Sequence, residues 1–200
     1  AGTLPWASSC GKLASRADAQ VEVAGSSGAH FKVAGSHWGG ALGAEGPSQM
    51  ALNDVAFFSS FARMTNHRGQ PGFYLLQPSD AFQAYALTQA MAEHYGPCYM
   101  RTYRPDVEFL YNDENKFELG GHEVLMQGRD LLIIASGYMV HQANRALEQL
   151  DGQGVDATLV DLYSIPFDAD AILDLANENN GMVLTLEDNY GGGIGSAVAD

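Results

Sequence analysis

The sequence predicts an α/β protein built from two consecutive domains with parallel sheets. Short apolar runs alternate with longer amphipathic runs along the chain. Strands separated by helical runs of about ten or more residues are typical of βαβ units, which form parallel sheets. The polar stretch at 111–121, which contains Asn-Asp-Glu-Asn and Gly-Gly, divides this pattern into two blocks. A chain of 200 residues is long enough for one large domain or two small ones.

The first block is expected to hold three strands and two helices. In chain order these are a strand at 30–34, a helix at 48–63, a strand at 73–76, a helix at 79–94 and a strand at 98–101. The 48–63 segment carries apolar residues at mixed spacings of three and four, which is typical of an amphipathic helix. Ser79 and Asp80 follow Pro78 and can cap the free backbone N–H groups of the next helix.

The second block repeats the alternation. We expect a strand at 131–135, a helix at 139–150, a strand at 157–161, a helix at 169–177 and a strand at 182–186. The predicted domains are therefore 1–112 and 128–200, with a linker at 113–127. Because the chain starts in mid-pattern and its last residues read as the first turn of a helix, we expect both domains to be incomplete.

Charge and hydropathy narrow the classes of partner. Ten Lys and Arg residues against 24 Asp and Glu give a net charge of −14, which argues against nucleic acid and repels anionic substrates unless local cations reverse the field. The longest apolar stretch, 131–140, is about half of a membrane span. Two widely separated cysteines and no recognisable signal peptide favour a reduced cytoplasmic protein.

Two polar motifs near predicted strand ends each have a functional and a structural interpretation. His37 lies in a glycine-rich loop, where it can hydrogen-bond a sugar hydroxyl, transfer a proton or serve the fold alone. Arg101 and Arg104 follow a predicted strand and can bind a phosphate or carboxylate, or form a salt bridge to Asp106.

Two further motifs near the end of the chain favour structural roles. Glu187 and Asp188 can do acid–base chemistry or hold a metal, but adjacent strand residues point to opposite faces, so solvent exposure or a domain contact is favoured. The glycines at 191–195 lack phosphate-loop spacing, which favours a tight turn without a ligand. The scattered histidines predict no zinc site, and no serine-hydrolase or zincin motif occurs.

Several motifs together resemble the transketolase family. The run 43–54, preceded by Gly35-Ser36-His37, is similar to the family's pyrimidine-binding domain. Further similar segments follow in the same order at 74–80, 99–105, 128–136, 141, 161–165 and 187–195. The last four are similar to the transketolase C-terminal domain, so the resemblance covers essentially the whole chain. Other thiamine enzymes share this architecture, but the Gly-Pro-Ser-Gln segment resembles transketolase most.

The resemblance implies transfer of a two-carbon ketol unit from a ketose phosphate to an aldose phosphate, with thiamine diphosphate and Mg²⁺ as cofactors. His37 is implied to hydrogen-bond the sugar, and Arg104 to clamp the substrate phosphate. Glu45 stands where the family places an aspartate that contacts a substrate hydroxyl. Leu13 and Gln49 are implied to lie near the cofactor. The family pattern places no catalytic residue and no metal ligand in this span.

The sequence also departs from the family. Where the family presents an aromatic platform for the cofactor's pyrimidine, this chain carries Cys10, Leu13 and Arg16. The pyrophosphate-binding domain and the glutamate that activates the pyrimidine lie outside the sequence, so the resemblance implies a pyrophosphate-binding partner in the same enzyme and a homodimer or hetero-oligomer. The alternative is a non-catalytic transketolase-like assembly module that has lost cofactor binding.

Overall fold

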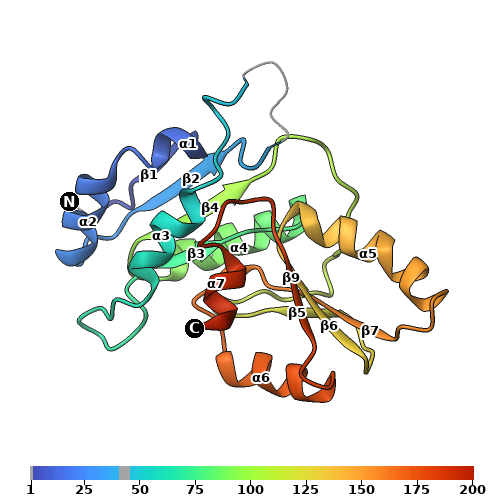
Figure 1. Cartoon of the computed structure of the whole chain (residues 1–200). Helices are drawn as coiled ribbons and strands as arrows, with labels where there is room; N and C mark the ends of the chain where they lie inside the picture. Colours follow the sequence, from blue (N-terminus) through green and yellow to red (C-terminus); the bar gives the residue numbers. More distant parts are fainter. Residues whose placement is uncertain (1, 41–45) are drawn as a thin grey trace.

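A computed structural model describes residues 2–40 and 46–200 and confirms the α/β class with two sheets (Figure 1). The first sheet has the strand order β1-β2-β4-β3-β8. Its strands are β1 (Trp6–Cys10), β2 (Lys32–Ser36), β4 (Cys98–Thr102), β3 (Tyr74–Leu76) and β8 (Ser164–Ile165). The first four are parallel, whereas β8 runs antiparallel to β3. The sheet is therefore mixed rather than purely parallel.

The second sheet has the order β5-β7-β6-β9. Its strands are β5 (Glu123–Met126), β7 (Ala157–Asp161), β6 (Leu131–Ala135) and β9 (Val183–Leu186). Parallel pairing joins β6 to β7 and β9, while β5 is antiparallel to β7. The β5 strand lies inside the segment 113–127 that the sequence predicts as a linker, so the second sheet begins before residue 128.

The helices of the first block are α1 (Gly11–Ala14), α2 (Asp18–Ser26), α3 (Asp54–Ala62) and α4 (Ala81–Glu93). The start of α4 confirms the predicted cap, because the Asp80 carboxylate accepts a hydrogen bond from the Gln83 backbone N–H at 2.7 Å. The prediction of a helix from residue 48 was wrong. Ala51 instead forms a β-bridge with Trp38, which holds the preceding segment out of helical conformation until α3 begins at Asp54.

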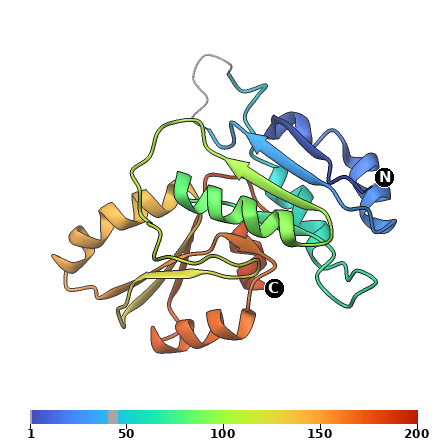
Figure 2. The same cartoon turned by 180° about the vertical axis from the view of Figure 1, so that it is seen from behind.

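The second block follows the prediction closely. Both β6 and β7 match their predicted ranges, and α5 (Tyr138–Asp151) and α6 (Ala169–Glu178) differ by one residue at most at each end. The short helix α7 (Ile194–Ala199) follows the glycine-rich turn. In Figures 1 and 2, α5 and α6 flank the second sheet, and α7 lies close to α3 of the first block.

One apolar core continues through both blocks. Phe58 of α3 stacks on Tyr99 of β4 with ring centroids 3.8 Å apart. The same cluster of buried residues includes Leu132, Val160 and Ile194 from the second block. Together with β8, which joins the first sheet from the second block, this core holds the two blocks as one packed unit. Among the described residues, no helix combines the length and the apolar composition that a membrane crossing requires.

Candidate functional site

Three neighbouring parallel strands end at one edge of the first sheet. Cys10 at the end of β1 pairs with Ser36 at the end of β2, which pairs in turn with Thr102 at the end of β4. Because parallel strands present their carboxyl ends together, the segments that follow them converge at this edge. These segments carry Leu13 and His37. Arg104 follows β4 there as well, so the structure brings three predicted site residues to one edge.

His37 directly follows β2 in a left-handed backbone conformation, with φ of 59°. Its Nδ1 lies 2.8 Å from the Ser36 hydroxyl oxygen, which orients the ring at the strand end. Non-glycine residues in this conformation carry local strain that the surrounding structure must support. The loop therefore presents His37 in a specific orientation at the sheet edge.

The two predicted cofactor residues occupy neighbouring segments of the same edge. Leu13 in α1 leaves 39% of its surface exposed. The Cys10 thiol donates a hydrogen bond to the Gln49 carbonyl oxygen at 3.3 Å, which joins the end of β1 to the segment before α3. Glu45 lies outside the described residues.

Arg104 is exposed and lines an open groove at the same end of the molecule. One wall of the groove is the start of α4 with the preceding Pro78 and Ser79, and the other is the segment from Thr102 to Phe109. The groove is lined by one cationic side chain, Arg104, and by the carboxylates of Asp80 and Asp106, in a protein whose net charge is −14. The Asp80 carboxylate is occupied by backbone N–H groups of Gln83, Leu110 and Tyr111, so an anionic ligand in this groove would have to contact Arg104 directly.

Arg101 does not take the ligand-binding role that one interpretation of the sequence gave it. Its side chain is fully buried, and its Nε lies 2.9 Å from Asp54 Oδ2. The guanidinium also lies over the Trp38 ring at 4.1 Å and donates a hydrogen bond to Gln77 Oε1 at 2.5 Å. Arg101 is therefore an internal counter-ion. The sequence carried no signal for Asp54, because the two residues come from different elements.

The carboxylates after β9 make contacts between the domains, as the favoured interpretation of the sequence expects. Glu187 Oε1 lies 3.6 Å from Arg101 Nη1, and its Oε2 accepts a hydrogen bond from the Ile194 backbone N–H at 2.8 Å. A side chain at Gly193 would overlap the Glu187 carboxylate, which explains the glycine in this turn. Burial raises the pKa of Glu187, and the Arg101 guanidinium offsets only part of that rise.

A second polar cluster, which the sequence did not reveal, joins the domains at the end of β7. Asp161 is fully buried, and its Oδ2 accepts hydrogen bonds from Gln83 Nε2 at 3.0 Å and from the Tyr111 hydroxyl at 2.7 Å. Burial raises the pKa of Asp161 to about 7 and also raises that of Tyr111. Nearby, the His141 Nε2 donates to the Ser79 carbonyl at 2.7 Å, so His141 also links the two domains.

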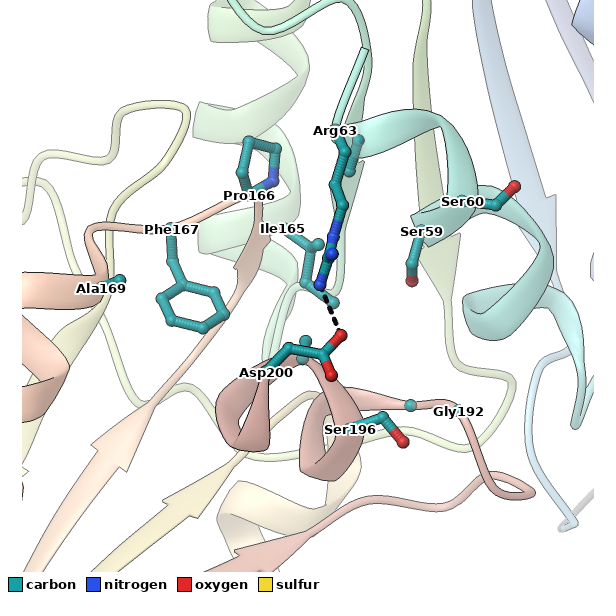
Figure 3. Close-up of a pocket in the computed structure, with 13 residues that line it drawn as sticks. Ser59, Ser60, Arg63, Ile165, Pro166, Phe167, Ala169, Gly192, Ser196 and Asp200 are labelled. Carbon is teal, nitrogen blue, oxygen red and sulfur yellow. Dashed lines mark hydrogen bonds and ion pairs between the residues drawn. The ribbon is translucent and has the colours of Figure 1, made fainter.

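A separate hollow lies between the C-terminal end of α3, the segment after β8, and α7 (Figure 3). Figure 3 shows Arg63 and Asp200 facing each other across this hollow as an ion pair. Both side chains are mostly exposed, and such surface pairs add little to stability. None of the predicted site residues lines it.

The fold defines a protein class with two successive α/β domains, in which the predicted site residues follow the strand ends of the first sheet. Residues 1–108 match the family described as the transketolase pyrimidine binding domain, and residues 120–200 match the transketolase C-terminal domain. The chain belongs to the transketolase family, which confirms the resemblance.

Curated relatives support the same assignment. The chain is 34% identical over 201 residues to transketolase from Homo sapiens, covering 98% of this chain and 31% of that protein. It is 33% identical to transketolase-like protein 1 from Bos taurus, covering 98% of this chain and 32% of that protein. The chain thus spans about one third of the length of the curated relatives it matches.

Solved structures share the fold. A split gene transketolase, described as an inactive beta4 tetramer, superimposes with a TM-score of 0.82 at 32% identity, covering 99% of this chain and 62% of that chain. A transketolase mutant from Pichia stipitis superimposes with a TM-score of 0.72 at 21% identity, covering 91% of this chain and 26% of that chain. The second likeness concerns the fold alone.

The residues at the sheet edge fit part of the cofactor that the family uses. The exposed apolar face of Leu13 suits the flat face of a pyrimidine ring, and the neighbouring Gln49 segment is polar. Among residues 2–40 and 46–200, no three His, Cys, Asp or Glu side chains gather as a metal site requires. The described residues at this edge thus offer an apolar surface that suits a pyrimidine ring, and no cluster of metal ligands.

Proposed function

We propose that this chain is the pyrimidine-binding and C-terminal part of a transketolase, which transfers a two-carbon ketol unit from a ketose phosphate to an aldose phosphate. The observation that supports the proposal is that Leu13, His37 and Arg104 follow three strands whose carboxyl ends lie side by side at one sheet edge. In this family, thiamine diphosphate with Mg²⁺ supplies the electron sink for ketol transfer.

Each residue at the edge has a role in this proposal. Leu13 packs against the pyrimidine ring of the cofactor, and Gln49 lies beside it. His37 donates a hydrogen bond to a hydroxyl of the sugar, since its ring is held at the strand end by Ser36. Arg104 binds the substrate phosphate through charge-assisted hydrogen bonds. Glu45 contacts a substrate hydroxyl, and the acidic surface elsewhere disfavours misplaced phosphate.

The proposal requires a partner. A pyrophosphate-binding domain or subunit supplies the ligands for diphosphate and Mg²⁺ and completes the site, so the working enzyme is a homodimer or hetero-oligomer. The tetrameric state of the split gene transketolase supports assembly through a chain of this kind. We further propose a cytoplasmic location, in keeping with the two separate free cysteines.

A non-catalytic assembly module is the alternative function. The observation that favours it is the replacement of an aromatic platform by Cys10, Leu13 and Arg16 at the edge of the first sheet. Aromatic stacking contributes about 0.5–1.5 kcal/mol beyond burial, so its loss weakens cofactor binding. The Arg16 guanidinium adds a cation near a cofactor that already carries a positive thiazolium.

Calorimetry with thiamine diphosphate and Mg²⁺ separates the two functions. The chain is joined to its pyrophosphate-binding region or mixed with that subunit, and the titration is followed by an assay of ketol transfer. Micromolar affinity with turnover supports the transketolase. Absence of binding at millimolar cofactor contradicts it and supports the assembly module.

A further inference from the structure

The second domain reaches the loop that carries His37. We propose that Asp188 is a positioning residue, which holds the loop 36–40 in the conformation that presents His37 to the sugar. The sugar in this inference rests on the proposed function, whereas the contact with the loop does not. Through Asp188, the C-terminal domain would contribute to substrate recognition without itself touching the substrate.

The contact between Asp188 and the loop is direct. Asp188 Oδ2 accepts a hydrogen bond from the Gly40 backbone N–H at 2.9 Å. Gly39 has a φ of 79°, and a Cβ atom at this position would overlap the Asp188 carboxylate. Both features of Gly39, its left-handed backbone and its missing side chain, are therefore needed for the carboxylate to approach the loop.

The second domain also packs on the residue between His37 and Gly39. Trp38 is fully buried, with the Arg101 guanidinium 4.1 Å from its ring and Tyr103 at a centroid distance of 5.2 Å. From the second domain, the backbone of Gly137 lies so near that a Cβ there would be 2.6 Å from Trp38 Cζ2. Trp38 is thus held between the two domains.

His37 needs such support because of its backbone. A histidine with φ of 59° lies in the left-handed region, which is populated only where the surroundings stabilise it. On one side Ser36 is fixed by pairing with Thr102 of β4. On the other side, Trp38 is buried and Gly40 is bound by Asp188. The Gly39 N–H also donates to the Ala51 carbonyl at 3.0 Å, so removing the Asp188 contact loosens the Gly40 end of this segment while the bridge to Ala51 remains.

The carboxylate matters as much as the position. A hydrogen bond to a charged acceptor is stronger than one to a neutral oxygen, so Asp188 restrains Gly40 more than an uncharged side chain would. Asp188→Asn keeps an acceptor oxygen without the charge, and Asp188→Ala removes both. Asp156, a carboxylate of the same domain that pairs with Arg129 at 3.1 Å, provides the matched control as Asp156→Ala.

The first test uses NMR on the 200-residue chain, without substrate or cofactor. In Asp188→Ala, amide exchange at Gly40 is expected to accelerate about tenfold and the imidazole signals of His37 to shift. Asp188→Asn should restore an intermediate exchange rate, and Asp156→Ala should match the wild type. Gly40 and His37 signals that stay unchanged in Asp188→Ala overturn the inference. If that variant does not fold, an unchanged Gly40 rate in Asp188→Asn overturns it instead.

The second test uses the chain combined with its pyrophosphate-binding part. Asp188→Ala is expected to raise KM for a ketose phosphate about tenfold while kcat stays within about twofold, because the loop acts in substrate binding. Equal KM values for the variant and the wild type would contradict a role of Asp188 in presenting His37 to the substrate. If the wild type shows no ketol transfer, the proposed function is contradicted. The NMR result alone then tests whether Asp188 holds the loop.

Discussion

Arg101 and Glu187 connect the two domains through a buried ion pair, with Nη1 and Oε1 3.6 Å apart and side-chain exposures of 0% and 7%. The same guanidinium binds Asp54 at 2.9 Å, and the Tyr99 hydroxyl donates to Asp54 Oδ2 at 2.7 Å. One buried cation therefore serves carboxylates from α3 and from the end of β9. The packing of the two sheets against each other therefore depends on the charge of Arg101.

We predict that Arg101→Met lowers the free energy of unfolding by about 3–5 kcal/mol, because it leaves two buried carboxylates without a cation. Glu187→Gln is expected to change stability little or to increase it above neutral pH, since it removes the excess negative charge. Urea denaturation followed by circular dichroism measures both. Arg129→Met, which breaks an exposed pair, is the control. An Arg101→Met variant as stable as this control would contradict the prediction.

Asp161 should make stability depend on pH. Burial raises its pKa to about 7 in the folded state, so the folded protein holds this proton more strongly than the unfolded chain does. The stabilisation that the folded protein gains by holding this proton is fully present below about pH 4. It is lost as the pH rises to 7, at about 1.4 kcal/mol of unfolding free energy per pH unit. Asp161→Asn removes this titration, so its stability relative to the wild type should rise across that window.

The pH prediction is checked by urea unfolding of both proteins at several pH values. The difference between the two curves isolates Asp161, because the other groups titrate alike in both. Asp156→Asn, at a partly exposed aspartate, should give a flat difference. A flat difference for Asp161→Asn as well would show that burial does not raise this pKa.

The two cysteines should differ sharply in reactivity. Cys98 is fully buried, and burial raises the pKa of its thiol to about 11, although Lys32 Nζ lies 3.5 Å away. Cys10 is only half-buried at the sheet edge. A disulfide reagent at pH 8 should label one thiol quickly and the other about a hundredfold more slowly. Cys10→Ser should abolish the fast phase, and its persistence would contradict the assignment.

Arg104 should act on the phosphate rather than on the sugar. In the completed enzyme, Arg104→Ala is expected to raise KM for phosphorylated sugars by about ten- to a hundredfold, because it removes a charge-assisted contact. KM for unphosphorylated ketols should change far less. Steady-state kinetics with paired donors measures the ratio, and Arg145→Ala, in α5, serves as a charge-matched control. Equal losses for both kinds of donor would rule out this role.

Leu13 provides a test of the cofactor contact. Leu13→Phe restores an aromatic face at an exposed position, so thiamine diphosphate should bind more tightly by about 0.5–1.5 kcal/mol. Calorimetry on the completed enzyme in the presence of Mg²⁺ gives the difference. Val23→Phe, at an exposed position of α2, controls for added apolar surface. Unchanged affinity would mean that Leu13 does not face the pyrimidine.

Local pattern was enough for much of the fold. The strands β6 and β7 match their predicted ranges because they are almost entirely buried and therefore read as unbroken apolar runs. Asp80 could be predicted as a cap because capping depends on neighbours in the sequence. By contrast, β1 was not predicted, since this edge strand is largely exposed and carries serines.

The candidate site likewise has features that the sequence predicts and features that it does not. The sequence by itself determined the family and the order of the segments that carry His37 and Arg104, because these are motifs of contiguous residues. Only the tertiary structure decided that Arg101 is an internal counter-ion and that Asp188 binds the loop of His37. Burial and pairing between distant segments depend on how two sheets pack. Local sequence periodicity therefore does not predict which charged residues form a pair.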